Sequence, residues 1–312
     1  MKILGVSAGT RSGSNDCMCT EALMGAKSVG AEVEFIRLFD LNINHCTGCV
    51  ACVNSIFNGR GNMCAIKDDF DWLLDKMLDA DGIIFSVPIF EKGAAGIFHT
   101  IMDRFGPRMD RGNNIIATQI AEKLGGKIPD PRILKDKVIS YMGIGGSDWM
   151  TRIEADFGIH ALTPMWKTID NEVFSWSLGI LSDQIKVQRA NQIGKNLAEA
   201  AKDLKNAVYQ GDKGVCSHCH CREFYFSTQG KAICCQCGIE GVINNNNGVY
   251  TFEFPEEQLR HAHDTLDGKF IHAADIDTNN RRAGALRGTS EYKERVQAYR
   301  DFIAASKPSE VK

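Results

Sequence analysis

Short apolar runs alternate with segments of helical spacing along the first two hundred residues of the chain. The strand-like runs fall at residues 2–7, 32–38, 82–87 and 137–142, and a fifth lies within 165–174. Between them, apolar residues recur at helical spacing, as at Phe70, Leu73, Leu74, Met77 and Leu78. This alternation predicts a parallel five-stranded sheet with helices on both faces, whose ligands bind beyond the carboxyl ends of the strands.

The helices follow from the same pattern. We expect them from Ser14 to about residue 30, from Asp68-Asp69 onward, from Pro88 to about Arg104, and along a closing stripe from Val187 to Val208. The side chains of residues 14–16 are of the kinds that cap a helix start.

Two stretches interrupt the alternation. Residues 105–136 form a long polar connection with one short helical piece at 117–124, and such long connections often act as lids, substrate-binding segments or oligomer contacts. Residues 210–214 have the composition of a linker. We therefore expect three parts: a domain over 1–209, a small module over 214–254 with a hairpin turn at 244–247, and a polar tail over 255–312.

Composition and charge narrow the classes of partner. The chain has 312 residues with 36 basic and 39 acidic side chains, so no overall positive field favours nucleic acid or an anionic membrane. No apolar run approaches the roughly 20 residues of a membrane span. The N-terminus enters a strand-like run without the pattern of a secretion signal, so we expect a cytoplasmic protein that binds neither nucleic acid nor membrane.

A loop rich in small residues follows the first strand-like run and precedes a helix. Its backbone N–H groups, its hydroxyls and the helix N-terminus together suit a terminal phosphate. The loop has neither the GxxxxGK[ST] pattern of nucleoside triphosphatases nor GxGxxG, so ATP and a dinucleotide are not its expected ligands. The alternative is an ordinary turn without a ligand. The candidate phosphate contacts are Ser7, Gly9, Thr10, Arg11, Ser12, Ser14 and Asn15.

Three motifs in order carry a resemblance to a known family. They are residues 5–15, residues 87–93 followed by Ile101-Met102-Asp103-Arg104, and the glycine-rich residues 143–147. Over roughly residues 1–205 the chain resembles the NADPH-dependent FMN reductases and iron-sulfur flavoproteins, which are flavodoxin-like proteins. The resemblance departs from the family pattern at Phe90, where the family often has Tyr, and in the 105–136 insertion.

The resemblance implies an α/β fold of the flavodoxin-like, doubly wound kind and FMN as cofactor. It assigns the phosphate of FMN to the loop above. It also implies contacts of the isoalloxazine ring with two further stretches, namely Pro88, Ile89, Phe90, Glu91, Lys92 and Gly93, and then Gly143, Gly145, Gly146 and Ser147.

Twelve cysteines are many for a chain expected in a reducing compartment, and eight of them form two groups. In the first group Cys46, Cys49 and Cys52 have CxxCxxC spacing. Cys64 follows after a gap of eleven residues. Closely spaced thiolates with a distant fourth ligand are typical of a [4Fe–4S] cluster. The iron-sulfur flavoproteins have this arrangement at this place, with a shorter gap to the last cysteine. The alternative is that these cysteines only line a loop near the flavin.

The second group consists of two CxxC pairs, Cys216 with Cys219 and Cys234 with Cys237. Two such pairs close a tetrahedral S₄ site in a small β module. The first pair lacks the glycine that rubredoxin-like iron sites usually have after the second cysteine, so we favour structural zinc and keep iron as the alternative. With few basic residues around it, the module is better suited to contact protein or cover the active site than to bind nucleic acid.

The sequence thus predicts a flavin-dependent oxidoreductase that passes electrons between a [4Fe–4S] cluster, FMN and an acceptor. The donor would be NAD(P)H or ferredoxin, the acceptor a small molecule or a protein, and the assembly a dimer or tetramer. One alternative is an NAD(P)H-dependent quinone or nitro reductase without a cluster. Another is a redox-sensing or scaffold protein that docks a partner through the small module. No side chain identifies itself as a catalytic acid or base; Glu91, Lys92 and His99 are candidates.

Overall fold

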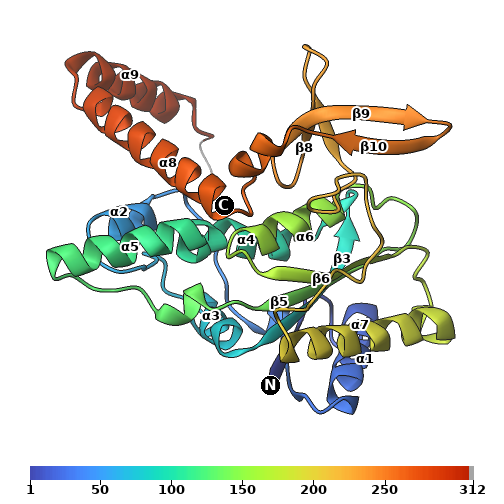
Figure 1. The fold of residues 1–312 in the computed structure, drawn as a ribbon. Coiled ribbons are helices and arrows are strands. Elements are labelled where there is room, and N and C mark those ends of the chain that lie inside the picture. Colours follow the sequence, from blue (N-terminus) through green and yellow to red (C-terminus); the bar gives the residue numbers. More distant parts are fainter. Residues whose placement is uncertain (309–312) are drawn as a thin grey trace. The chain divides into compact units, whose positions relative to one another are not determined.

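The computed structural model describes residues 1–308 and divides into a large unit, Met1–Lys269, and a smaller one that begins at Phe270. The large unit is built around a parallel sheet (Figure 1). Its strands have the order β2-β1-β3-β5-β6. The bounds are β1 Lys2–Ser7, β2 Glu32–Arg37, β3 Gly82–Phe90, β5 Val138–Ile144 and β6 Lys167–Phe174. Counted over the parallel strands alone, this is the order 2-1-3-4-5 of flavodoxin-like folds, which confirms the expected fold class.

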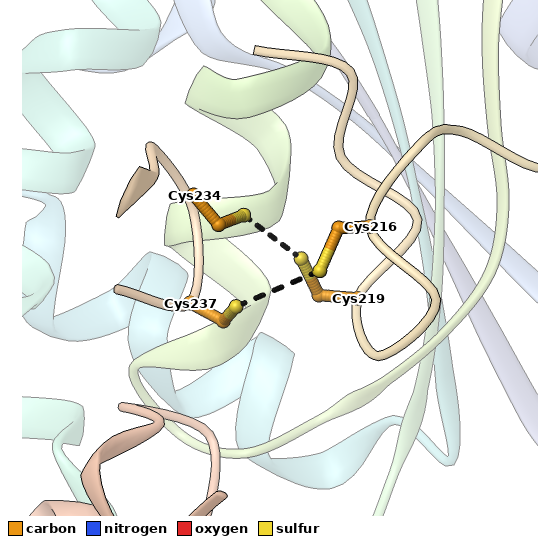
Figure 2. Close-up of side chains that lie close together, drawn as sticks. All are labelled: Cys216, Cys219, Cys234 and Cys237. Atoms are coloured by element: carbon orange, nitrogen blue, oxygen red, sulfur yellow. Dashed lines mark hydrogen bonds between the residues drawn. The ribbon is translucent and has the colours of Figure 1, made fainter. Parts of the chain in front are cut away.

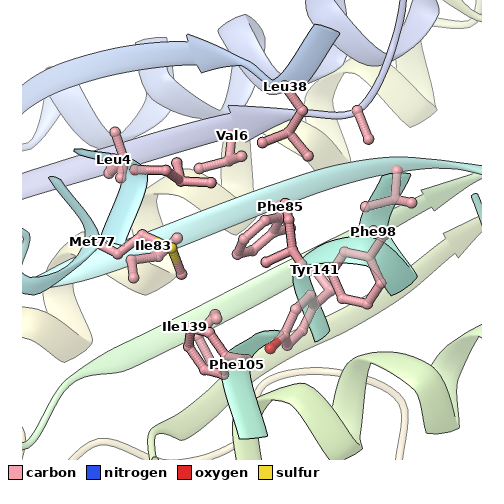
Figure 3. Close-up of a cluster of buried hydrophobic side chains, with 14 of the residues drawn as sticks. Leu4, Val6, Leu38, Met77, Ile83, Phe85, Phe98, Phe105, Ile139 and Tyr141 are labelled. Carbon is pink, nitrogen blue, oxygen red and sulfur yellow. The ribbon is translucent and has the colours of Figure 1, made fainter. Parts of the chain in front are cut away.

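Helices cover both faces of the sheet. Helices α1 (Ser14–Ser28) and α7 (Gln184–Lys202) pack on one face with a core that includes Ile3, Ile84 and Val138. The neighbouring residues Leu4, Ile83 and Ile139 point to the other face, where α3 (Phe70–Asp79), α4 (Gly96–Met109) and α6 (Ile153–Leu162) pack (Figure 3). Burial on both faces explains why β1, β3 and β5 read as continuous apolar runs, whereas the more exposed edge strands β2 and β6 also contain polar residues.

Strand β3 is longer than the sequence predicts. It continues through Pro88, which pairs in register with Ile144, and it turns back into β4 (Gly93–Ala94). The carbonyl of Pro88 accepts a hydrogen bond from the Ala95 N–H. The expectation that the strand ends at Pro88 and a helix follows at once is therefore wrong, because proline lacks only the N–H and its carbonyl is still available for pairing.

The expected loop over 105–136 is largely helical. Helix α4 runs on to Met109 through a kink at Gly106, which precedes Pro107. Helix α5 (Arg111–Leu124) follows at once, with the Asp110 carboxylate accepting the Asn113 N–H at its start, and a short 3₁₀ turn covers Pro131–Leu134. The long connection is therefore corrected to a kinked helix, a second helix and a short loop. The helical piece expected at 117–124 is thus the second half of α5, which begins six residues earlier, at Arg111.

A second, antiparallel sheet forms the small β module. Its strands β7 (Phe224–Phe226), β8 (Ala232–Cys234), β9 (Glu240–Asn246) and β10 (Val249–Glu253) lie in the order β10-β9-β8-β7. The hairpin turn falls at Asn247 and Gly248, which both have positive φ, so Asn244 to Asn246 are strand rather than turn. An Asn-Gly pair suits a two-residue turn of this kind.

The remaining segments are mostly helical. The tail expected to be weakly patterned contains α8 (Leu266–Arg287) and α9 (Ser290–Ser306) after a 3₁₀ turn at Glu256–His261. The closing helix α7 ends at Lys202, so Leu204 and Val208 lie beyond it. Short pieces elsewhere are α2 (Ala51–Phe57) and 3₁₀ turns at Leu38–Asp40 and Ile180–Ser182. Within residues 1–308 every helix is too short or too polar to cross a membrane.

Candidate functional site

The loop between β1 and α1 is held in shape by Asp16, which the sequence analysis considered only as a helix-capping residue. The N-cap of α1 is instead Gly13, without a side-chain cap. The Asp16 carboxylate accepts hydrogen bonds from the Ser7 hydroxyl at 2.6 Å and from the Ser12 N–H at 3.0 Å. The Ser7 oxygen in turn accepts the Gly9 N–H at 3.1 Å. Arg37 pairs with Asp16 at 2.6 Å, so the negative charge beneath the loop is balanced.

This loop has the features of an anion site. A Cβ on Gly9 would lie 2.5 Å from the Asn15 Cβ, so only glycine fits there. The first N–H groups of α1, beginning at Ser14, have no acceptor within the helix and favour an anion. Thr10 and Arg11 are exposed, and the Arg11 guanidinium lies 3.5 Å from Asp40 at the rim of the loop. The loop therefore fits the phosphate of FMN.

The other two predicted stretches leave the sheet at the same edge as this loop. Ser7 pairs in register with Ser86, and the Ala8 N–H donates to the Ser86 carbonyl at 2.9 Å. One strand further on, Pro88 pairs with Ile144. Since all these strands are parallel, residues 8–15, 88–93 and 145–147 gather at the carboxyl edge, where ligands of such sheets bind.

The tip of the β3–β4 hairpin carries four of the predicted residues. Glu91 and Lys92 form the two-residue turn with φ of 48° and 69°, and Phe90 is 63% exposed. Ile89 is half-buried, and its Cδ1 would lie 3.0 Å from a Cβ on Gly145. The Lys92 ammonium lies over the ring of Trp149, 5.3 Å from its centroid.

The hairpin is fixed to α6 by Asp156. This carboxylate accepts the Ala94 N–H at 2.9 Å and lies 3.5 Å from His99 Nε2, and it would be 3.0 Å from a Cβ on Gly93. Close by, burial and the charge of Asp156 raise the pKa of Glu223 to about 7. Glu223 is thus a group near this hairpin that is able to exchange protons near neutral pH.

The glycine-rich loop after β5 is joined to the end of β6. The Gly145 N–H donates to the Phe174 carbonyl, and the Gly145 carbonyl accepts both the N–H of Ser177 at 3.0 Å and its hydroxyl at 2.6 Å. Gly143 is buried in β5, Gly146 is exposed, and Ser147 Oγ accepts the Trp149 N–H at 3.3 Å. This loop therefore offers a bare backbone surface beside the hairpin tip.

The first cysteine group lies around the start of α2. Cys46 and Cys49 are exposed, whereas Cys52 and Cys64 are partly buried. Burial raises the pKa of Cys52, and the nearby Cys64 and Cys46 raise it further, so these three thiols are neighbours. In the described part of the chain no three of the four lie within 4.8 Å of one another, as a single ion would require. A cubane cluster holds its thiolates farther apart than a single ion does.

Basic and N–H groups face this cysteine group. The buried Arg104 guanidinium lies 3.6 Å from Cys64 Sγ and also binds Asp68 and the Asn44 carbonyl. The Ala51 N–H and the Thr47 hydroxyl lower the pKa of Cys49. These contacts favour the thiolate of Cys49, the form that binds iron, whereas burial disfavours the thiolate of Cys52.

The second cysteine group forms a closed site. The sulfur atoms of Cys216, Cys219, Cys234 and Cys237 all lie within 4.8 Å of one another (Figure 2). Cys216 is 3.9 Å from Cys237 and Cys219 is 3.5 Å from Cys234. Three of the four are fully buried, which leaves no open position for a substrate. The donor set fits zinc or iron.

The two turns that present these cysteines differ. Gly238 follows the last cysteine with φ of 81°, as expected for such a turn. In the first turn the same place is taken by His220 with φ of 65°, a conformation unfavourable for a side chain. The His220 ring stacks on Tyr209 at 4.3 Å between centroids, which compensates this strain.

Comparison with known proteins agrees with this geometry. The model of the family described as NADPH-dependent FMN reductase matches residues 1–167. A solved structure titled flavone reductase is 63% identical, covers 99% of this chain and 100% of that one, and superposes with a TM-score of 0.90.

Two curated proteins are similar at lower identity. An iron-sulfur flavoprotein of Methanocaldococcus jannaschii is 29% identical over 214 residues, which are 66% of this chain and 100% of that protein. A flavone synthase of Aspergillus candidus is 25% identical over 255 residues, which are 77% of each chain.

Proposed function

Because the chain belongs to the NADPH-dependent FMN reductase family, we propose that this flavin-dependent oxidoreductase uses NADPH to reduce flavones. The observation that carries the proposal is the 63% identity to a flavone reductase over essentially the whole chain. A flavone synthase, named for chemistry on the same class of compound, is also similar over 77% of the chain. This proposal replaces the quinone or nitro acceptor of the sequence analysis with a flavone.

The reducible group of a flavone is a carbon–carbon double bond conjugated to a carbonyl. Its reduction adds a hydride, derived from NADPH, to the carbon distant from the carbonyl and a proton from water to the other carbon, which leaves NADP⁺ and the saturated ring. Bound FMN supplies the carrier for the two electrons. The chain would hold the FMN phosphate at Ser7 to Asn15 and the ring between residues 88–93 and 143–147.

The test is anaerobic turnover with NADPH and the flavone apigenin. We expect NADPH oxidation at 340 nm to match loss of apigenin one for one, with a product two hydrogen atoms heavier by mass spectrometry. Naringenin, which lacks the double bond, is the control and should not be consumed. NADPH oxidation that proceeds with menadione but leaves apigenin unchanged would return the function to a quinone reductase.

We further propose that Cys46, Cys49, Cys52 and Cys64 hold a [4Fe–4S] cluster. The proposal is supported by their neighbouring thiols, by Arg104 beside Cys64 and by similarity to an iron-sulfur flavoprotein. Anaerobic protein should then contain about four iron and four sulfide per chain in this group. Cys49→Ser should remove them, whereas Cys17→Ser, in a partly buried cysteine on α1, should not. If the wild type lacks iron after anaerobic reconstitution, the cluster proposal is wrong and a reductase without a cluster remains.

We also propose that the chain forms a homo-oligomer, a dimer or tetramer, in the cytoplasm. Three apolar side chains in the segment after β6 and in the first turn of α7 support this, because Leu178, Leu181 and Ile185 are 89%, 50% and 80% exposed. Light scattering should show that Ile185→Lys lowers the assembled mass, while Leu124→Lys, at a 64% exposed position on α5, does not. A wild-type mass of one chain would contradict the proposal.

A further inference from the structure

Three aromatic side chains stand exposed at the carboxyl edge of the sheet. Phe90, Trp149 and Trp176 are 63%, 64% and 64% exposed. They belong to three separate segments, namely the β3–β4 hairpin, the loop after β5 and the loop after β6. Burial of large aromatic side chains usually stabilises a protein. Three such rings exposed at one edge therefore indicate a ligand-binding surface.

The register of the sheet brings these three segments together. Pro88, Ile144 and Phe174 are paired across β3, β5 and β6. Phe90 and Trp176 each lie two residues beyond this row. Gly145 joins the segments, since its carbonyl accepts both hydrogen bonds of Ser177 and Ile89 packs against its Cα.

Backbone strain is also present at this edge. Trp176 has φ of 51°, and Glu91 and Lys92 also have positive φ. This conformation is unfavourable for residues with a side chain, most of all a bulky one. At Trp176 it is maintained from both sides, by Ser177 bound to Gly145 and by the Lys186 ammonium 3.3 Å from the Trp176 carbonyl. Strain that the surroundings hold in place is common where a ligand binds.

We propose that Trp149 and Trp176 bind the rings of the flavone substrate, with Lys92 positioning Trp149. This inference rests on the proposed function and adds the residues that select its substrate. The ring system of a flavone is planar and aromatic, and its faces suit the faces of indole rings. Lys92 lies over Trp149 at 5.3 Å and so couples the hairpin tip to the β5 loop.

The chain contains a matched control for Trp149. Trp72 on α3 is 46% exposed and carries Lys76 over its ring at 5.6 Å, so it repeats the pairing of a tryptophan with a lysine. It points outward from a helix rather than lying in a loop at the carboxyl edge. Trp72→Ala therefore removes the same kind of contact outside the proposed site.

The test measures KM for apigenin with the FMN-loaded enzyme and NADPH. Trp149→Ala and Trp176→Ala should each raise this KM about tenfold, as loss of one ring contact predicts, and Trp149→Phe should restore most of it. FMN content, the melting temperature and the NADPH–ferricyanide rate should stay within twofold of wild type. Trp72→Ala should change none of these. Unchanged KM in both variants, or loss of FMN as the main effect, would overturn the proposal.

A binding measurement distinguishes failure of this binding site from failure of the proposed flavone reduction. If the wild type reduces no flavone, apigenin is titrated against the oxidised holoenzyme with tryptophan fluorescence as the readout. Quenching that Trp149→Ala and Trp176→Ala weaken, but Trp72→Ala does not, would support the binding site while refuting flavone reduction. Absence of apigenin binding to the wild type would overturn both.

Discussion

The buried side chain of His160 shows how strongly the core of the sheet domain can lower the pKa of a histidine. It is 1% exposed, its Nδ1 lies 2.8 Å from the Tyr141 hydroxyl, and its ring stacks on Phe105 at 4.3 Å. Burial lowers its pKa to about 3. Nε2 has no hydrogen-bond partner among the described residues. His160 therefore stays neutral at physiological pH, and its role is in packing.

This burial predicts a pH dependence of stability. Between the folded pKa of about 3 and the ordinary value of 6.5, the unfolded chain binds the proton and the folded chain does not. The free energy of unfolding should therefore fall as pH drops below 6.5, by up to ~1.4 kcal/mol per pH unit from this group.

Urea unfolding between pH 8 and pH 4 measures this slope, and His160→Gln should flatten it. The Gln side chain can still accept a hydrogen bond from the Tyr141 hydroxyl, but it does not titrate. Above pH 7 the curves of the two proteins should run parallel, which is the internal control. Equal slopes below pH 6 would show that His160 is charged or accessible in the folded state.

A second prediction at the residue scale concerns Gly9 and the binding of FMN. Because a Cβ there would lie 2.5 Å from Asn15 Cβ, Gly9→Ala must displace the phosphate loop and should weaken FMN binding. Loss of even one hydrogen bond to the charged phosphate is typically worth ~1.5–3 kcal/mol, or at least tenfold in Kd. Gly96→Ala is the control, since a Cβ there meets nothing within 4 Å. Titration of apoprotein with FMN compares them; equal Kd values would place the phosphate elsewhere.

At the scale of elements, the parts with a strong local pattern could be predicted from sequence. Strands β1, β3 and β5 were found because their apolar runs are short and continuous, β2 because apolar and polar residues alternate along it, and α3 because its apolar face repeats. The helical residues 106–116 were missed, because Gly106-Pro107 resembles a helix end yet only kinks the chain, whereas the piece expected at 117–124 is the second half of α5. The tail helices were missed for another reason, since no residue of α9 is buried and its sequence carries no clear apolar face.

In the candidate site, too, residues that belong to a local sequence motif could be predicted, and residues placed by distant contacts could not. Glycines and hydroxyls of the phosphate loop lie close in sequence and form a visible motif. Asp16, Asp156 and Trp176 act through contacts made by the fold, so the sequence alone does not reveal them. Trp176 did carry one usable signal, because an aromatic residue just beyond a predicted parallel strand must lie at the ligand-binding edge.

The small β module makes a prediction at this scale. Its core contains Cys216, Cys234 and Cys237, so we expect metal binding and folding of the module to be coupled. Cys237→Ser should release one zinc per chain and expose residues 214–254 to protease. Cys235→Ser, at the exposed neighbouring cysteine, is the control and should retain the metal.

Zinc analysis and limited proteolysis of the two variants measure this outcome. Since Ala155 of α6 belongs to the same core, we also expect the loss of metal to loosen α6. Iron in place of zinc in the wild type, with reversible reduction, would instead make the module an electron-transfer site.

At the scale of the whole molecule, one buried ion pair joins distant parts of the chain. The Lys269 ammonium lies 2.7 Å from the Asp110 carboxylate, and their side chains are 3% and 9% exposed. Asp110 also begins α5, so this pair connects the first turn of α8 to the junction of α4 and α5. A Cβ on Gly112 would lie 2.7 Å from Lys269 Cβ, which shows how closely the two segments pack.

The last prediction follows from this pair. Lys269→Met leaves a buried carboxylate without its partner and should lower the free energy of unfolding by ~3–5 kcal/mol. Lys231→Met removes an ion pair of similar length, 2.9 Å to Glu240, whose side chains are 58% and 40% exposed, and should cost at most ~1 kcal/mol. Asp110→Asn combined with Lys269→Met should recover part of the loss, because no charge is then left buried. Urea unfolding of the three variants measures these changes in the free energy of unfolding. Equal losses for Lys269→Met and Lys231→Met would mean that water reaches Asp110 and that the start of α8 does not stay docked in solution.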